Sequence, residues 1–289
     1  MSTVAPVPGE VVFAPPRALL GRIRPGVALA SLAVLYFVIA VIAPSVLTSH
    51  GPNEINLQDT LQSPSIHHVF GTDPSGRDLY SRVVYGARQA LLIGVGATVL
   101  AMAVGIVLGT LSGIAGGIVD AAINRFVEVL FAFPVLILAL LLVSIFGPSA
   151  TTTLLAVAIG SAPGYTRLIR GQVLAVRGSG YVEAAHALGH PFPQIVRRHI
   201  FPNAMRPLVV VLTLGMGQSI VWASGLSFLG LGVAPPSSEW GALLDAGRDW
   251  ITQAWWLEVM PGVAIVAFAL SVTTIGRFVQ QQLEGGISR

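Results

Sequence analysis

The sequence predicts an all-α, polytopic membrane protein with six transmembrane helices. Three observations predict this fold class. Of the 289 residues, 54% are hydrophobic and only 10% are charged, against roughly a quarter charged in a typical soluble domain. The mean hydropathy is +0.77. Five long runs contain no charged residue, and in a bilayer such runs form helices because each helix satisfies its own backbone hydrogen bonds.

The uncharged runs define the expected crossings in order. Each run can hold the roughly 20 apolar residues that one crossing needs. The third run, 129–166, is about twice that length, and Gly147-Pro148-Ser149 interrupts it near its middle. Glycine and proline there favour a turn, so this run is predicted to be a helical hairpin. The six predicted crossings cover 26–47, 90–118, 129–146, 150–167, 207–231 and 258–277.

The arginines predict how the helices are oriented. The chain has no lysine, and all 16 basic residues are arginine. Placing both termini in the cytoplasm leaves twelve arginines inside and four outside, which fits the positive-inside rule. The outer four are Arg77, Arg82, Arg88 and Arg248. We therefore expect cytoplasmic tails at 1–19 and 281–289, a first helix and outer loop at 20–88, and a membrane core at 89–280.

Several kinds of chemistry are excluded by residues that the sequence lacks. Without lysine there is no phosphate-loop ATPase motif and no Schiff base. Without cysteine there is no thiolate metal site or thiol nucleophile. Charged residues occur only at the ends of the predicted crossings and none lies in their cores, which argues against an ion-coupled carrier. All six histidines lie in loops, which argues against an intramembrane hydrolase. We predict no catalytic residue, no metal ligand and no bound cofactor, and the arginines indicate topology rather than nucleic-acid binding.

The first outer region, 48–88, contains a turn sequence at 73–76. Leu79, Val83 and their neighbours then recur at helical spacing, which predicts a helix lying on the membrane surface. The alternative is that the loop contacts a partner, because functional contacts concentrate on loops. Its candidate residues are Asp73, Gly76, Arg77 and Asp78.

The second region is the cytoplasmic segment at about 168–206. Residues 181–188 are typical of a short helix that Gly189 and Pro191 end, and a second short helix is expected over 193–199. Ala184 and Ala185 make the first helix slim enough to enter a groove, and Glu183 gives it one carboxylate. The sequence thus predicts a rigid projection between two crossings.

The third region, 233–258, is expected to be an outer helix lying flat, with Trp240 on its apolar face and Arg248 and Asp249 mostly away from it. The simplest interpretation of its tryptophans is an aromatic belt at the membrane interface.

In the second crossing, glycines at four-residue spacing let helix backbones approach closely, so packing is favoured over lining a pore. These glycines are Gly105, Gly109, Gly113 and Gly117.

Three motifs resemble one known family. Glu183-Ala-Ala, Gly189 and Ile200-Phe-Pro202 resemble the EAA loop of bacterial ABC importer permeases, although His199 and Phe201 stand where the general pattern has Ile and Leu. Gly71-Thr-Asp-Pro-Ser-Gly-Arg-Asp78 and the segment 226–241 resemble the C-type member of the permease pair in dipeptide and oligopeptide importers. The likeness extends over most of 20–277.

This resemblance implies a type I ABC importer permease fold in a bacterial inner membrane, surrounded by lipid. It implies three protein partners: a homologous permease subunit, two ATP-binding subunits or one fused ATPase that bind ATP and Mg, and an extracytoplasmic peptide-binding protein. Nickel chelates and glutathione are alternative cargoes in the same family. Contacts with the ATPases would come from Glu183, Ala184, Ala185, Gly189, His199 and Pro202. Contacts with the binding protein would come from Asp73, Gly76, Arg77, Asp78, Trp240, Arg248 and Asp249.

Overall fold

The computed structural model describes residues 25–285. Within these residues the chain is almost entirely helical, and the only extended pairing is an isolated bridge between Thr72 and Asp78. The expected N-terminal tail at 1–19 lies outside the described residues. The longer helices are α1 (Pro25–Ile42), α2 (Leu79–Ala115), α3 (Gly117–Ala132), α4 (Val135–Phe146), α5 (Ala150–Arg177), α9 (Leu208–Leu226) and α11 (Trp256–Gly285).

Short elements connect these helices. Three 3₁₀ turns lie outside the long helices, and two π-helical segments extend α7 and α9. The short elements are η1 (Pro44–Val46), η2 (Leu57–Asp59), α6 (Gly180–Ala187), α7 (Phe192–Ile195), η3 (Val196–Ile200), α8 (Phe201–Met205), η4 (Ser227–Leu231), α10 (Trp240–Gly247) and η5 (Arg248–Trp250).

Four helical segments among the described residues are long and apolar enough to cross a membrane: α1, α2, α9 with η4, and α11 to residue 282. A fifth is obtained if α3 and α4 count as one broken span, because they meet at a bend of 88°. The predicted third crossing at 129–146 is therefore not one straight helix. Pro134 is the N-cap residue of α4, and since proline lacks a backbone N–H it cannot continue the hydrogen bonds of α3.

The second crossing begins earlier than predicted. The sequence predicted a separate surface helix after Leu79, but α2 runs without a break for 37 residues to Ala115. Its start is fixed by the Asp78 side chain, which accepts a hydrogen bond from the Ser81 backbone N–H at 2.8 Å and so acts as an N-cap. The surface-helix prediction was wrong because the side chains of its first turns are buried by other segments of the chain.

The predicted hairpin is present, with α4 ending at Phe146 and α5 beginning at Ala150. Helix α5 covers the predicted fourth crossing but is not among the strongly apolar helices. It forms the most extensive helix pair of the molecule with α2. Three glycines make this close approach possible, because an added Cβ would lie 2.6–2.7 Å from α5 atoms at Gly105, Gly109 and Gly113. Gly117 differs, since it lies at the start of α3 with open space around it.

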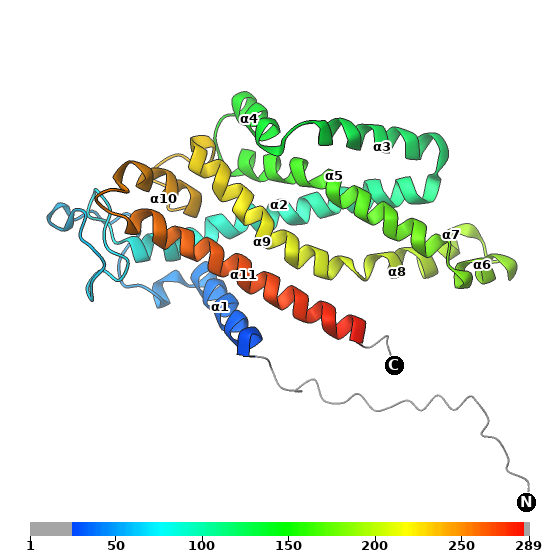
Figure 1. Cartoon of the computed structure of the whole chain (residues 1–289), viewed down its shortest axis with the longest axis horizontal. Helices are drawn as coiled ribbons and strands as arrows, with labels where there is room; N and C mark the ends of the chain where they lie inside the picture. The colour runs from blue at the N-terminus through cyan, green and yellow to red at the C-terminus, as the bar shows by residue number, and fades with distance from the viewer. Residues whose placement is uncertain (1–24, 286–289) are drawn as a thin grey trace, which may run out of the picture.

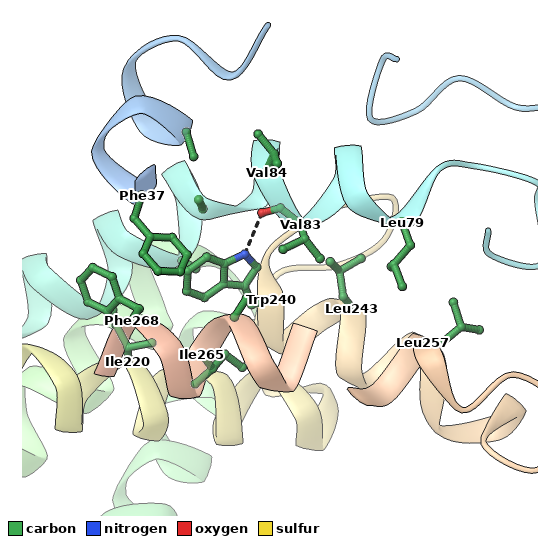
Figure 2. Packing of buried hydrophobic residues seen from close by; sticks show 14 of the residues in the cluster. Phe37, Leu79, Val83, Val84, Ile220, Trp240, Leu243, Leu257, Ile265 and Phe268 are labelled. Carbon is green, nitrogen blue, oxygen red and sulfur yellow. Dashed lines mark hydrogen bonds between the residues drawn. The ribbon is translucent and has the colours of Figure 1, made fainter. Parts of the chain in front are cut away.

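The largest buried cluster joins α1, α2, α9, α10 and α11 around Trp240 (Figure 2). The Trp240 side chain is completely buried, and its indole N–H donates to the Val83 carbonyl at 2.9 Å. Phe37 packs edge-on against both Trp240 and Phe268, with ring centroids 5.5 and 5.4 Å apart. Such aromatic pairs each contribute about 0.5–1.5 kcal/mol beyond their burial, so this cluster fixes α10 on the helices.

The molecule is elongated and has two different ends (Figure 1). Residues 43–78 and 232–239 gather with α10 at one end, which we call the loop end. Helices α6, α7 and α8 with η3 lie at the other, which we call the α6–α8 end. Helices α2 and α9 run between the two ends, α5 leads into the α6–α8 end, and α11 runs from the loop end toward the C-terminus.

Candidate functional site

The α6–α8 end presents a short helix with one face inward and one outward. Val182 and Ala185 are buried, at 1% and 5% exposure, and pack with residues of α5, α7, η3, α8 and α9. Glu183 and Ala184 lie on the exposed face of α6. The sequence interpretation placed Ala185 on the docking surface, but its side chain holds α6 against the body of the chain. Ala184 and Ala187 leave the outward face slim.

Gly189 ends α6 in a conformation that favours glycine, with φ of +76°. The backbone N–H of His190 donates to the Ala185 carbonyl at 3.2 Å, and that of Gly189 donates to the His186 carbonyl at 3.0 Å. This pattern closes the helix end. A Cβ on Gly189 would meet no atom within 4 Å, so its backbone conformation, and not crowding, requires glycine.

The charged groups of this end lie on its surface and are unpaired within the part of the chain that the structure describes. Glu183 is exposed, and no hydrogen bond or ion pair holds its carboxylate in residues 25–285. Arg197 and Arg198, one helical turn from α8, are also exposed without a carboxylate partner there. The surface therefore offers both signs of charge to another molecule at low cost, because these groups need not break internal bonds first.

His199 and Pro202 support the second half of this surface. The His199 ring is half-buried with its centroid 6.4 Å from that of Tyr181 in α6, and its carbonyl accepts from the Asn203 side-chain amide at 2.6 Å. Pro202 is exposed in the first turn of α8. The predicted second short helix is thus longer than expected, because α7, η3 and α8 continue one another from Phe192 to Met205.

Two arginines that the sequence suggested only as topology signals tie α5, the helix that leads into this end, to its neighbours. Arg170 of α5 forms a two-pronged ion pair with Asp120 of α3, with N–O distances of 2.6 and 2.7 Å. The Arg177 guanidinium donates to the Gly113 and Ile114 carbonyls at 3.2 Å. Fifty residues separate Arg170 from Asp120, and no local pattern in the sequence reveals such a pair. These contacts connect α5 to α3 and α2.

The loop end contains a buried network centred on Asp73. Its carboxylate accepts hydrogen bonds from the Ser75 and Arg77 backbone N–H groups and from two guanidinium groups, Arg77 Nε at 2.6 Å and Arg82 Nη1 at 2.7 Å. The Asp73 and Arg82 side chains are each only 4% exposed. Arg82 also donates to the Pro236 and Ser237 carbonyls, so it joins the first loop to the segment before α10.

The predicted docking residues of the loop end have different environments. Asp78 is buried at 7% exposure, caps α2, and lies 3.0 Å from His68 Nδ1. Gly76 is buried, and a Cβ there would overlap the Asn56 carbonyl. Trp240 is buried in the core, so its side chain does not lie on the surface where the sequence placed a contact with the binding protein. Arg248 and Asp249 are exposed, with side chains 56% and 85% accessible.

The segment before α10 has its own buried carboxylate. Glu239 is 1% exposed and accepts hydrogen bonds from the Gly241 and Ala242 backbone N–H groups at 3.0 and 2.9 Å. Burial raises the pKa of this carboxyl, and the two N–H groups partly offset that rise.

A polar cavity of about 600 Å³ opens beside the first loop, lined by His50, Glu54, Asp59, His67, His68 and Asp78. In residues 25–285 no three His, Cys, Asp or Glu side chains are grouped to hold a metal.

Comparison with known proteins agrees with this architecture. Residues 105–289 match the family described as the binding-protein-dependent transport system inner membrane component. The probable D,D-dipeptide transport system permease protein DdpC of Escherichia coli is 39% identical over 88% of this chain and 85% of its own. The dipeptide transport system permease protein DppC of Alkalihalophilus pseudofirmus is 39% identical over 86% and 82%. The glutathione transport system permease protein GsiD of Shigella dysenteriae is 36% identical over 87% and 83%.

Solved structures share the fold at low sequence identity. The MetNI methionine ABC transporter, in an inward-facing form, superposes with a TM-score of 0.58 at 18% identity, over 68% of this chain and 94% of that one. An amino acid ABC transporter superposes with a TM-score of 0.55 at 19% identity, over 70% and 94%. Taken with the matched sequence model and the similar relatives, the chain belongs to the family of binding-protein-dependent transport system inner membrane components, the permease subunits of ABC importers.

Proposed function

We propose that this chain forms half of a membrane path for dipeptides and oligopeptides, paired with a homologous permease subunit. Two ATP-binding subunits, or one fused ATPase, dock at the α6–α8 end and hydrolyse ATP with Mg. A peptide-binding protein delivers cargo at the loop end. Both termini lie in the cytoplasm of a bacterium. The supporting observation is the exposed, glycine-ended helix α6 with the unpaired Glu183, in a chain whose relatives are named dipeptide permeases.

The proposed mechanism uses rigid connections. When the ATPases close, they move α6, which is docked on them. Because Val182 and Ala185 fix α6 to the core of this chain, the core moves with it. Helix α5 moves with α6, and the Arg170–Asp120 pair carries the motion to α3. Rigid-body motion of this kind converts an event at one end into alternate opening of the path. No residue of this chain takes part in bond chemistry.

The first test is of the orientation of the chain in the membrane. Single cysteines can be introduced for labelling because the chain has no cysteine of its own. A single cysteine at Ile66, which is 92% exposed at the loop end, should react with an impermeant thiol reagent added outside intact cells. One at the exposed Ala187 of α6 should react only after the membrane is permeabilised. The opposite pattern would reverse the roles proposed for the two ends.

The cargo is tested in proteoliposomes that contain both permeases, the ATPases and the binding protein. We expect ATP-dependent uptake of a labelled dipeptide that excess unlabelled dipeptide abolishes. Glutathione is the competing cargo, because one similar relative is named for its transport. Uptake of glutathione with no uptake of dipeptides would replace the peptide assignment, while uptake that persists without ATP would contradict the proposed energy source.

A further inference from the structure

A single amide side chain lies near the middle of the apolar span Leu208–Leu231. Gln218 is the only charged or amide-bearing residue in this span. It lies about 15 Å from one end of the span and about 20 Å from the other, at a rise of roughly 1.5 Å per residue. Gln218 is exposed on the surface of the chain, and its side chain has no hydrogen-bond partner within residues 25–285.

The other sides of α9 are covered by neighbouring helices. Ser219 Oγ accepts a hydrogen bond from Thr98 of α2 at 2.8 Å. An added Cβ on Gly217 would lie 3.1 Å from the Ala269 carbonyl of α11, and one on Gly215 would overlap Tyr165 of α5. Gln218 therefore faces a side of α9 that residues 25–285 leave open near the middle of the helix.

The open side forms a stripe along the helix. Val221 and Gly225 follow Gln218 at spacings of three and seven residues, so they share its face. Both are exposed, and a Cβ on Gly225 would meet no atom within 4 Å. Unlike Gly105 and Gly109, Gly225 has no packing reason within this chain to lack a side chain. The stripe thus combines a neutral amide with free space beside it.

Lipid is a poor neighbour for this stripe. A primary amide has two donors and an acceptor, and placing them in hydrocarbon without partners carries a large desolvation penalty. Polar groups at membrane depth almost always face a protein interior or a water-filled cavity. Gln89 provides the contrast within the same chain, because its amide oxygen accepts a hydrogen bond from Ser237 at 3.0 Å.

We propose that Gln218 lines the water-filled translocation path and hydrogen-bonds the backbone of the peptide in transit, an inference that rests on the proposed function. A primary amide both donates and accepts, and so matches the N–H and C=O that every peptide repeats. Being neutral, it does not distinguish acidic from basic side chains. Water competes for the same bonds, so the contact orients cargo without retaining it.

The first test measures water access in the assembled complex. The variants Gln218→Cys and Val221→Cys should react with a charged, water-soluble thiol reagent at least tenfold faster than Leu35→Cys. Leu35 is a suitable control because it is 54% exposed near the middle of α1 and faces outward from the bundle. Equal reaction rates at all three positions would mean that lipid or the second permease covers the stripe. That result would overturn the proposal.

The second test measures transport. Gln218→Leu should lower ATP-dependent dipeptide uptake about tenfold with the complex still assembled, and Gln218→Asn should retain most of it. Wild-type uptake by Gln218→Leu would overturn the hydrogen-bonding role. The results distinguish a failure of this inference from a failure of the proposed function. If dipeptide is transported but the cysteines stay unreactive, this inference fails alone. If the cysteines react but no dipeptide is transported, the path is supported and the peptide cargo is wrong.

Discussion

The loop end and the α6–α8 end differ in the burial and pairing of their charged side chains. At the loop end, Asp73 and Arg82 are buried and bonded to each other, and Arg82 also ties two distant segments together. At the α6–α8 end, Glu183 is exposed without an ion pair among the described residues. A buried, fully bonded charge fixes a structure, whereas an exposed, unpaired charge is available to a partner. The comparison suggests that the buried network makes the loop end rigid beneath its exposed residues Arg248 and Asp249, whereas the α6–α8 end keeps its charges on the surface.

The largest expected effect comes from opening the buried network of the loop end. Asp73→Ala leaves the Arg82 guanidinium buried without a carboxylate, and removing one member of a buried ion pair costs about 3–5 kcal/mol. We expect a large fall in thermal stability of the detergent-solubilised complex. Arg248→Ala is the matched control, because Arg248 is exposed and its ion pairs are long, so its removal should cost less than about 1 kcal/mol. Equal losses in both variants would remove the contrast between buried and exposed charge.

A smaller structural effect with a larger functional effect is expected at Gly189. Its φ of +76° disfavours a β-branched residue by about 1–2 kcal/mol. Gly189→Val should therefore assemble but no longer couple ATP hydrolysis to loaded binding protein. Gly171→Val is the control, since it lies in α5 without positive φ and has open space around it. If Gly189→Val keeps full stimulation of ATPase activity, the end of α6 does not transmit the signal.

The buried carboxyl of Glu239 gives a pH-dependent effect at the loop end. Because burial raises its folded-state pKa, the folded state binds this proton more tightly than the unfolded state does. Its contribution to stability is greatest at pH values below the unfolded pKa, and is lost as pH rises through the folded pKa. Glu239→Gln removes the titration, so the melting temperature of this variant relative to wild type should increase with pH. A difference that does not change with pH would contradict the assigned cause.

The smallest effect on stability is expected at Glu183. Glu183→Ala removes an exposed, unpaired carboxylate, so the free energy of unfolding should change by less than about 0.5 kcal/mol. Stimulation of ATP hydrolysis by loaded binding protein should nevertheless fall. A loss of stability in Glu183→Ala would indicate a structural role in place of docking.

The sequence predicted the features that follow from local chemistry. The apolar runs located α1, α9 and α11, the glycine-proline turn located the α4–α5 hairpin, and Gly189 marked the end of α6. It could not predict contacts between distant segments. Arginine and tryptophan are both typical of a membrane interface. Only the folded chain shows that Arg82 bonds Asp73 and that Trp240 bonds Val83. For the same reason the separate surface helix after Leu79 was wrongly predicted, and Ala185, which the sequence assigned to ATPase coupling, is buried.

The α3–α4 bend illustrates the same limit. Residues 129–146 carry no charge, and Ser144 is their only polar residue, so hydropathy alone predicted one helix. Pro134 was visible in the sequence, but a proline inside a long apolar run can produce a mild kink as well as a sharp break. The structure has a sharp bend of 88°, and α4 packs against α5 after it. Docking roles of individual residues likewise depend on surfaces that other subunits provide.

The most direct test of the central claim is site-specific cross-linking in the complete importer. A photo-reactive group attached through Ala184→Cys, on the exposed face of α6, should form a covalent product with an ATP-binding subunit. The same group attached through Asp249→Cys should form one with the peptide-binding protein and none with the ATPase. Reaction of the α6 position with the binding protein, or of neither position with its expected partner, would contradict the assignment of the two ends.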